Sequence, residues 1–428
     1  MNVKKYHSLK ESGVEWIDKI PAHWELRRIG QLFKFRNEKV SDEEYMPLSV
    51  TKDGVVPQLE NVAKTMHNEN RKKVLKGDIV INSRSDRRGS SGLAMLDGSC
   101  SLINHVLEPR VELEGKYIHY LFKSVPFCDE YYRWGTGIVD DLWSTQKDRM
   151  SQIQIPFPPI NEQKSIARFL DHKINSMAKL KKMLEEKINK LKEYRSSLIT
   201  QAVTKGLDPN VPMKDSGIEW LGEVPGHWSV SKIKYLAHPT AVKVGTRFHG
   251  SYIGLENIES STGKLIGSMN IAEITGEALL CRRSDVLYSK LRPYLKKCIT
   301  AEKEYACTTE LIILKPNMKV IPDFLKYLLI SDKLTSYIDS TTYGAKMPRT
   351  NWDVIGNVLV YIPPLDEQSK IVSFIDDKLN LIDNLMNKLN RELHILDTYR
   401  SSLITAAVTG QIDVSDWKEA EEELETIL

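Results

Sequence analysis

Apolar residues recur at alternating intervals of four and three positions in two long stretches of the chain. The first stretch has Leu170, Ile174, Met177, Leu184, Ile188 and Leu191 on this pattern, and the second has Ile375, Leu379, Ile382, Met386, Leu389, Leu393 and Leu396. This spacing is the heptad seam of a coiled coil, so we predict two long α-helices. A helix of about 42 residues is roughly 60 Å long. Neither helix can bury its stripe alone, and each therefore needs a partner.

Outside these stretches the pattern changes to short β-rich runs separated by turn residues. Such runs occupy residues 78–82, 285–289 and 311–314, and short helical patterns follow at 117–122 and 324–329. Runs of this kind bounded by turn residues indicate strands. We therefore predict mixed α/β regions between the long helices.

Blocks of the sequence recur at a constant offset. Residues 10–16 return as 214–220 at an offset of 204, and the segment Tyr194–Thr200 returns unchanged as Tyr399–Thr405 at an offset of 205. Residues 159–205 match 364–410 at 21 of 47 positions, whereas the intervening regions match weakly. A period this long exceeds that of solenoid repeats, so each copy is a domain with its connector. Two halves related by a pseudo-twofold axis follow from this pattern.

The repeat divides the chain into five parts. We assign residues 1–158 and 207–362 to two mixed domains, 159–206 and 363–411 to the two long helices, and 412–428 to an acidic tail. The fold class is α+β, with the two domains separated by helices that pair as an antiparallel coiled coil. The tail from Asp413 onward has seven acidic residues and one lysine, so we expect it to be solvated and partly mobile.

Charge supports pairing between the two helices. Residues 161–206 carry 11 basic and 5 acidic side chains, whereas residues 366–409 carry 5 basic and 7 acidic ones. Opposite charge favours contact between the two helices over pairing with a second molecule. The whole chain of 428 residues is nearly balanced, with 60 basic and 57 acidic side chains, so any nucleic-acid surface must be local.

Several classes of protein are disfavoured by missing patterns. The sequence has no apolar leader and no stretch long enough to span a bilayer, so we expect a cytoplasmic protein. Its 5 cysteines form no CxxC pair, which argues for reduced thiols and against zinc. No phosphate loop or dinucleotide fingerprint is present. The residue pattern predicts no catalytic site and no metal or cofactor bound by this chain.

Two local motifs that could suggest chemistry have structural explanations. The Pro-Pro pairs at 158–159 and 363–364 lack the polar and aromatic residues that flank such a pair in adenine methyltransferases. We assign them to strand-to-helix junctions in which Asn161 and Asp366 cap the helices. His23 and His227, each next to a tryptophan, are interpreted as packed, hydrogen-bonded histidines because no second metal ligand lies near them.

Basic loops that contain glycine or proline occupy equivalent places in the two mixed domains. Such loops suit contacts to phosphates and to base edges. The candidates for DNA contact in the first domain are Arg84, Arg87, Arg88 and Ser90, and those in the second are Lys290, Arg292, Lys296, Tyr343, Lys346 and Arg349. A second loop pair, 135–137 and 342–349, precedes the Pro-Pro junctions. We expect two recognition surfaces on duplex DNA, held apart by a rigid spacer.

The repeated blocks resemble the specificity subunits of type I restriction-modification systems. The resemblance rests on Ser12–Trp16 followed by Ile20–Trp24 and its second copy, on the Pro-Pro-x-x-Glu-Gln junctions, and on the duplicated Tyr-Arg-Ser-Ser-Leu-Ile-Thr segment. It spans essentially the whole chain. Ser289–Tyr294 is similar to a motif common in the recognition domains of this family, from which Asn82–Gly89 departs. The two domains are therefore expected to recognise different half-sites.

The resemblance implies partners and a division of labour. Each target-recognition domain would bind one half of a split DNA sequence, and the helices would fix the gap between the halves. The subunit would be non-catalytic and would recruit two modification subunits, which bind S-adenosylmethionine and methylate adenine. Restriction subunits would add translocation and cleavage of DNA with ATP and Mg. No membrane partner is implied.

Two other classes of protein stay open on sequence alone. One is a stand-alone methyltransferase or nuclease whose motifs have diverged. The other is a coiled-coil scaffold that does not bind DNA, which the near-neutral charge would favour. Neither explains why two divergent domains share one duplicated frame.

Overall fold

The computed structural model describes residues 4–58, 70–84, 86–137, 143–244, 249–270, 276–344 and 346–418. Its chain forms two compact units. The first unit comprises residues 1–184 and 391–428, and the second comprises residues 185–390. Each unit thus contains one mixed domain together with part of each long helix.

The first unit is built on antiparallel sheets. Its strands are β1 (Leu9–Val14), β2 (Ile17–Pro21), β3 (Glu25–Arg28), β4 (Phe33–Arg36), β5 (Lys39–Val40), β6 (Leu48–Thr51), β7 (Gly54–Pro57), β8 (Arg71–Val74), β9 (Ile79–Asn82), β10 (Ser91–Leu93), β11 (Gly98–Cys100), β12 (Asn104–Pro109) and β13 (Gln154–Phe157). The short helices are α1 (Ile29–Leu32), α2 (Gly115–Lys123), α3 (Val125–Arg133) and α4 (Lys147–Gln152). The main sheet has the order β10-β9-β12-β4.

The second unit contains a matching set of elements. Its strands are β14 (Met213–Asp215), β15 (Glu223–Pro225), β16 (Ser229–Lys232), β17 (Ala237–Thr240), β18 (Ser251–Ile253), β19 (Met269–Asn270), β20 (Ala278–Cys281), β21 (Val286–Ser289), β22 (Cys298–Thr300), β23 (Tyr305–Thr308), β24 (Leu311–Pro316) and β25 (Leu359–Ile362). Its helices are α6 (Pro322–Ile330), α7 (Asp332–Ser340) and α8 (Trp352–Asn357), with single 3-10 turns η2 (Ile233–Tyr235), η3 (Leu255–Asn257) and η5 (Pro293–Leu295).

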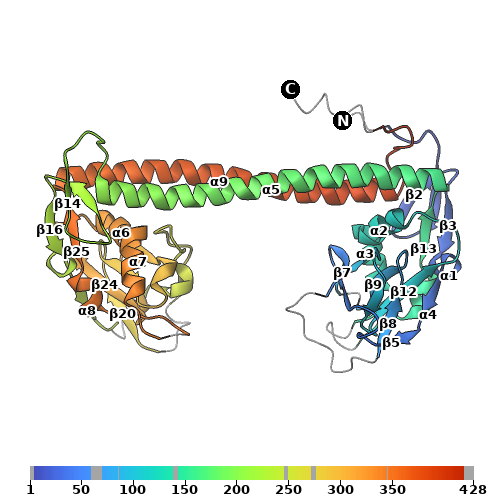
Figure 1. Cartoon of the computed structure of the whole chain (residues 1–428), viewed down its shortest axis with the longest axis horizontal. Helices are drawn as coiled ribbons and strands as arrows, with labels where there is room; N and C mark the ends of the chain where they lie inside the picture. Colours follow the sequence, from blue (N-terminus) through green and yellow to red (C-terminus); the bar gives the residue numbers. More distant parts are fainter. Residues whose placement is uncertain are drawn as a thin grey trace. The chain divides into compact units, whose positions relative to one another are not determined.

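The central sheets of the two units have the same topology. The order β17-β24-β21-β22 in the second unit corresponds strand for strand to β4-β12-β9-β10 in the first. In both, the paired helices after the sheet, α2 with α3 and α6 with α7, pack beside it (Figure 1). The predicted strands at 78–82, 285–289 and 311–314 and the predicted helices at 117–122 and 324–329 are confirmed.

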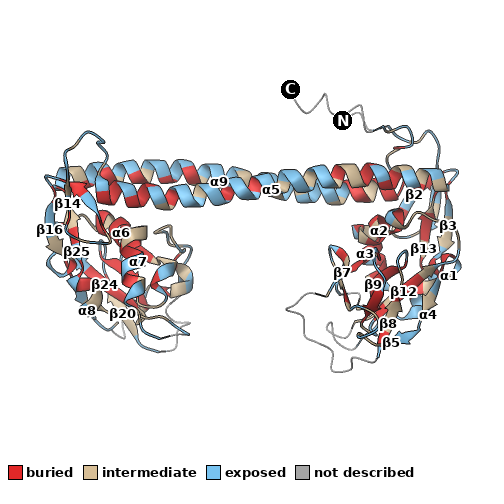
Figure 2. Ribbon diagram, viewed as in Figure 1, coloured by how far each residue is buried: buried red, intermediate tan, exposed pale blue. Residues whose placement is uncertain are grey.

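Two long helices carry the heptad pattern. Helix α5 runs from Ile160 to Lys205, and helix α9 runs from Leu365 to Val408. All thirteen predicted seam residues are buried or half-buried, whereas Leu180 and Met183, which lie off the seam, are 46% and 54% exposed. Figure 2 shows this alternation of buried and exposed positions along both helices.

Ion pairs connect α5 with α9 inside each unit. In the first unit the Lys181 Nζ lies 2.9 Å from the Asp397 Oδ1, and in the second unit Arg195 pairs with Asp383. Arg195 is nearly buried, and burial lowers the pKa of its guanidinium from the ordinary value. From Lys181 to Arg195 the residue number rises by 14 on α5, and from Asp397 to Asp383 it falls by 14 on α9.

The Pro-Pro junctions end a strand and begin a long helix, as predicted. Strand β13 ends at Phe157 and α5 begins at Ile160, and the same order holds for β25 and α9. The predicted caps are wrong, because Asn161 and Asp366 lie inside the first turns of the helices. The chain closes this turn at the proline carbonyls instead, since Pro159 O accepts from the Glu162 N–H at 2.9 Å and Pro364 O accepts from the Glu367 N–H at 3.0 Å.

The acidic tail is more ordered at its start than we expected. Val414 is buried in the core of the first unit, and the Trp417 ring lies edge-on to Phe169 with centroids 5.5 Å apart. Lys4 pairs with Asp416. Val414 and Trp417 therefore pack this segment against the first unit, and residues 419–428 lie outside the described part of the chain.

Some classes of site are missing from the described ranges. All five cysteines are free and buried there. No helix of these ranges is long and apolar enough to cross a membrane. The same ranges contain no group of three or more His, Cys, Asp or Glu side chains arranged to hold a metal ion.

Candidate nucleic-acid interface

The first basic loop of the first unit lies between β9 and β10. Its backbone forms two consecutive turns, because the Arg87 N–H donates to the Arg84 O and the Ser90 N–H donates to the Arg87 O, each at 3.1 Å. The Arg84 N–H donates to the Asn82 Oδ1 at 3.0 Å. These turns leave the side chains of Arg87 and Arg88 exposed, whereas Arg84 is half-buried and Ser90 is buried.

Arg88 is partly engaged by the protein. Its guanidinium pairs with Asp129 and lies 5.3 Å from the centroid of the Tyr132 ring. Asp129 and Tyr132 belong to α3, so this pair ties the loop to the helix. Within the described ranges Arg87 has no ion pair, which leaves its charge available to solvent or a ligand.

The equivalent loop of the second unit lies between β21 and β22. Arg292 is exposed and has a left-handed backbone with φ of 48°, which turns the chain sharply at this point. Lys290 is half-buried and donates from Nζ to the Thr309 O at 2.6 Å. Lys296 is only 13% exposed and donates to the Ser196 Oγ at 3.0 Å and to Asp332. The two lysines therefore bond within the protein.

The second predicted loop of this unit folds against the first. Its ends pair, because the Arg349 N–H donates to the Tyr343 O at 3.0 Å and the Tyr343 N–H donates to the Arg349 O at 3.3 Å. The Arg292 N–H donates to the Pro348 O at 2.8 Å, which joins the two loops. Tyr343 is 59% exposed and Lys346 is exposed. Arg349 donates to the Glu310 Oε2 at 2.6 Å.

The first unit repeats this backbone frame. The Thr145 N–H donates to the Ser83 O at 2.9 Å, as the Thr350 N–H donates to the Lys290 O at 2.9 Å in the second unit. Thr136 and Ser144 pair at 2.9 and 3.0 Å, as Tyr343 and Arg349 do. The predicted loop at 135–137 is within the described ranges, and residues 138–142, which follow it, lie outside the described part of the chain.

A buried histidine supports the second loop of the first unit. His105 in β12 bonds through Nε2 to the Thr145 O at 2.8 Å. Burial lowers the pKa of His105 from its ordinary value, so this side chain is neutral at physiological pH. The contact fixes the loop without adding charge to the surface.

The structure sorts the candidate residues into two groups. Arg87, Arg292, Tyr343 and Lys346 are exposed on paired loops, where a ligand can reach them. The other candidates are partly or wholly turned toward the protein: Arg84, Arg88, Ser90, Lys290, Lys296 and Arg349. The partners Glu310 and Asp332 were not found from sequence, because nothing in the local sequence indicates them.

The repeated junction motif has a clear structural role in both units. Glu162 accepts from the Trp24 Nε1 at 2.9 Å and bonds to His23 at 2.6 Å. In the second unit, Glu367 accepts from the Trp228 Nε1 at 3.0 Å and bonds to His227 at 2.7 Å. The predicted hydrogen bonds of both histidines are confirmed. The rings are less packed than expected, with 49% and 43% of the side chains exposed.

The glutamine that follows each glutamate is fully buried. Gln163 accepts from the Glu114 N–H at 2.9 Å and donates to the Pro158 O at 2.8 Å. Gln368 accepts from the Ile321 N–H at 2.8 Å and donates to the carbonyls of Pro363 and Lys319 at 3.0 Å. These bonds fix the start of each long helix to the segment before α2 or α6.

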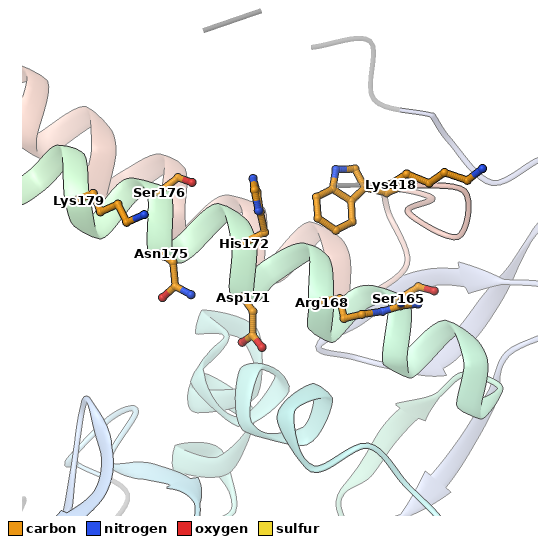
Figure 3. Close-up of a pocket in the computed structure, with 9 residues that line it drawn as sticks. Ser165, Arg168, Asp171, His172, Asn175, Ser176, Lys179 and Lys418 are labelled. Carbon is orange, nitrogen blue, oxygen red and sulfur yellow. The ribbon is translucent and has the colours of Figure 1, made fainter. Parts of the chain in front are cut away.

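A polar cavity lies along the outer face of α5 in the first unit. It has a volume of about 610 Å³ and is lined by Arg168, His172 and Lys179 of α5 and by Lys418 (Figure 3). Asp171 also lines the cavity, and its carboxylate pairs with Lys116. The cavity is lined by side chains of both charges, and none of its lining residues belongs to the basic loops.

Comparison with known proteins identifies a family. The model described as "Type I restriction modification DNA specificity domain" matches residues 21–190 and 278–394. One similar protein is the Type I restriction enzyme MjaVIII specificity subunit of Methanocaldococcus jannaschii, which is 23% identical over 449 residues, with 97% of each chain covered.

Two solved structures share the fold. One comes from work on complex assembly and conformational transition of the type I R-M system, with a TM-score of 0.71, 13% identity, and coverage of 92% of this chain and 99% of that one. The other is the crystal structure of the HsdS subunit from Thermoanaerobacter tengcongensis, with a TM-score of 0.52, 15% identity, and coverage of 92% and 98%.

Proposed function

Because the chain belongs to the family of type I restriction modification DNA specificity domains, we propose that it is the sequence-specific DNA-recognition subunit of a type I restriction-modification complex. It is a non-catalytic subunit. The observation that carries this proposal is the duplication of one loop frame in two units, with different side chains at the exposed positions. Two recognition surfaces with different chemistry suit a split, asymmetric target.

Each domain recognises one half of the target through its paired loops. In the second domain, Arg292, Tyr343 and Lys346 are the exposed side chains that contact DNA. In the first, Arg87 has the corresponding role, with Arg84 and Arg88 beside it. An arginine that donates two bonds to guanine adds roughly 1 to 3 kcal/mol of discrimination. Ser90, Lys290, Lys296 and Arg349 shape the loops from inside.

The long helices form an antiparallel coiled coil that acts as a spacer. Two observations support this part of the proposal: the buried seam on both helices, and the equal and opposite steps between the Lys181–Asp397 and Arg195–Asp383 pairs. The heptad seam and its ion pairs make the helix pair stiff. The distance between the two half-sites would then depend on helix length.

We also propose the boundaries of the parts. Residues 1–158 and 207–362 are the recognition domains, 159–206 and 363–411 are the spacer helices, and 412–428 is the acidic tail. Most of the tail's charge lies beyond Lys418, outside the described residues.

The complex supplies the chemistry. Two modification subunits bind S-adenosylmethionine and methylate adenine, and restriction subunits use ATP and Mg to translocate and cleave DNA. This chain binds duplex DNA and these subunits and holds no cofactor of its own.

Co-purification and binding experiments test the function. The chain assembled with its modification subunits should bind duplex DNA with an affinity that falls steeply with salt, and should methylate it only in the presence of those subunits. Methylation by the chain alone would contradict the non-catalytic role. DNA affinity that is unaffected by salt, or absent from the assembled complex, would contradict the recognition role.

A further inference from the structure

The two units contain the same niche at the start of a helix. Ser124 and Ser331 each donate from Oγ to a leucine carbonyl at 2.7 Å, and each is followed by the first residue of α3 or α7. These first residues are Val125 in the first unit and Asp332 in the second. The repeated Tyr-Arg-Ser-Ser-Leu-Ile-Thr segment lies beside both positions, on α9 in the first unit and on α5 in the second.

In the second unit the chain itself places an anion in this niche. The Asp332 carboxylate accepts from the Ser196 Oγ at 2.7 Å and pairs with Lys296. The Asp332 N–H donates to the Thr200 Oγ1 at 2.8 Å. Burial of Asp332 acts to raise its pKa, but the bonds from Lys296 and Ser196 outweigh this and lower it. The niche therefore favours negative charge.

Among the described residues of the first unit, no carboxylate occupies the position of Asp332. Val125 replaces the aspartate, is 49% exposed, and lines a cavity of about 530 Å³. The charged side chains that line this cavity are the cations Lys52, Arg88, Lys123 and Arg400 and a single carboxylate, Asp397. That carboxylate is already paired with Lys181 at 2.9 Å. Arg88 is likewise paired with Asp129, so Lys52, Lys123 and Arg400 are the cations that remain at the cavity.

The repeat explains why Arg400 lacks the ion pair that its counterpart forms. Its counterpart in the second unit, Arg195, pairs with Asp383, but Ala178 occupies the position equivalent to Asp383. Within the described ranges Arg400 has no ion pair, and its guanidinium is exposed at the cavity. Ser401, the counterpart of the serine that donates to Asp332, lines the same cavity.

Lys123 is a second cation that lines the cavity. Its Nζ donates to the Lys52 carbonyl, and the side chain is half-buried. The pKa of Lys123 is lowered to about 8, chiefly by burial; Asp53 acts to raise this pKa and Arg400 acts to lower it. A bound anion would favour the charged form of this lysine.

We propose that the cavity beside Val125 binds a phosphate group, which takes the place that the Asp332 carboxylate fills in the second unit. Arg400 and Lys123 supply charge, Ser401 supplies a hydroxyl donor, and the N-terminus of α3 faces the same space. Guanidinium groups and helix N-termini both favour phosphate oxygens. The phosphate comes either from the DNA backbone or from a free phosphorylated molecule. The phosphate site itself does not rest on the proposed function. Only the DNA backbone as the source of the phosphate rests on it.

Calorimetric titration of inorganic phosphate into the full chain tests the site, with chloride at matched ionic strength as the background. We expect one phosphate per chain. Val125→Asp supplies the internal carboxylate of the second unit and should weaken binding at least about tenfold. Val125→Asn is the matched neutral control and should bind as the unaltered chain does. Arg400→Gln changes an exposed side chain and should also weaken binding.

The same variants distinguish the sources of the phosphate. If Val125→Asp also weakens duplex binding and lowers its salt dependence, the DNA backbone is the source. If phosphate binding is lost and duplex binding is unchanged, the source is a free phosphorylated molecule. Failure of the recognition role alone would abolish duplex binding in every variant and leave phosphate binding intact. No saturable phosphate binding, two equal sites, or equal binding by Val125→Asp would overturn the proposal.

Discussion

Replacing Arg292 by glutamine separates DNA contact from internal packing in the second recognition domain. The guanidinium is exposed at the tip of a loop, on a backbone with φ of 48°. In the described ranges it has no ion pair, so Arg292→Gln removes a charge without breaking a contact inside the protein. We expect the fold to be retained and duplex binding to weaken.

The size of the effect follows from counterion release. Each phosphate neutralised by a protein cation contributes about 0.9 to the slope of log affinity against log salt concentration. Loss of one contact should therefore lower that slope by about 0.9. Between 50 and 200 mM salt, the affinity ratio of unaltered chain to variant should shrink by roughly 3.5-fold. Fluorescence anisotropy with a labelled duplex that carries the target measures both quantities.

Lys296→Gln is the matched control in the same loop. Lys296 is 13% exposed and is held by Asp332 and Ser196, so its charge is already neutralised. We expect an unchanged salt slope and a lower melting temperature. If Lys296→Gln lowered the slope while Arg292→Gln did not, the assignment of inward and outward cations would be refuted.

Three further predictions concern the two buried glutamines, the spacer and the half-buried Lys123. Gln368→Leu removes three hydrogen bonds of a fully buried amide and should destabilise the second unit by about 2 to 4 kcal/mol. Gln163→Leu removes two such bonds and should destabilise the first unit by less. Hydrogen exchange resolved by unit measures both effects, and loss of protection in the other unit would contradict the assignment. Deleting residues 184–190 together with 388–394 removes one heptad, about 10 Å, from each helix and should shorten the gap between half-sites by about 3 base pairs. Methylation mapping measures the gap, and an altered half-site sequence would contradict the spacer role. The pKa of Lys123 is lowered to about 8 in the folded chain. Between about pH 8 and the ordinary lysine value of 10.5, the unfolded chain therefore binds more protons than the folded chain, and stability rises with pH. Denaturant unfolding should show this rise relative to Lys123→Met, and equal pH profiles of the two chains would contradict it.

The elements that the sequence predicted well are those with strong periodicity. The heptad spacing found both long helices because burial of one stripe repeats along more than four turns. Patterns of this kind are local, so neighbouring residues carry the whole signal.

The direction of individual basic side chains could not be predicted in the same way. In sequence, Lys296 resembles any loop lysine. It turns inward because it bonds to Asp332 and Ser196, which are 36 and 100 residues away along the chain. Arg349 meets Glu310 across 39 residues for the same reason. The contact of Trp417 with Phe169 could not be predicted either, because one aromatic ring among many charges gives no periodic signal. Long-range contacts decide these cases.

Mapping methylated adenines across a genome tests the central claim most directly. Cells that produce the chain with its modification subunits should carry a single split motif, with two unlike half-sites, a fixed gap and methylation on both strands. Arg292→Gln should relax or abolish the half-site recognised by the second domain alone. A continuous motif, or methylation with no motif in the presence of a stable complex, would contradict recognition by two separate domains.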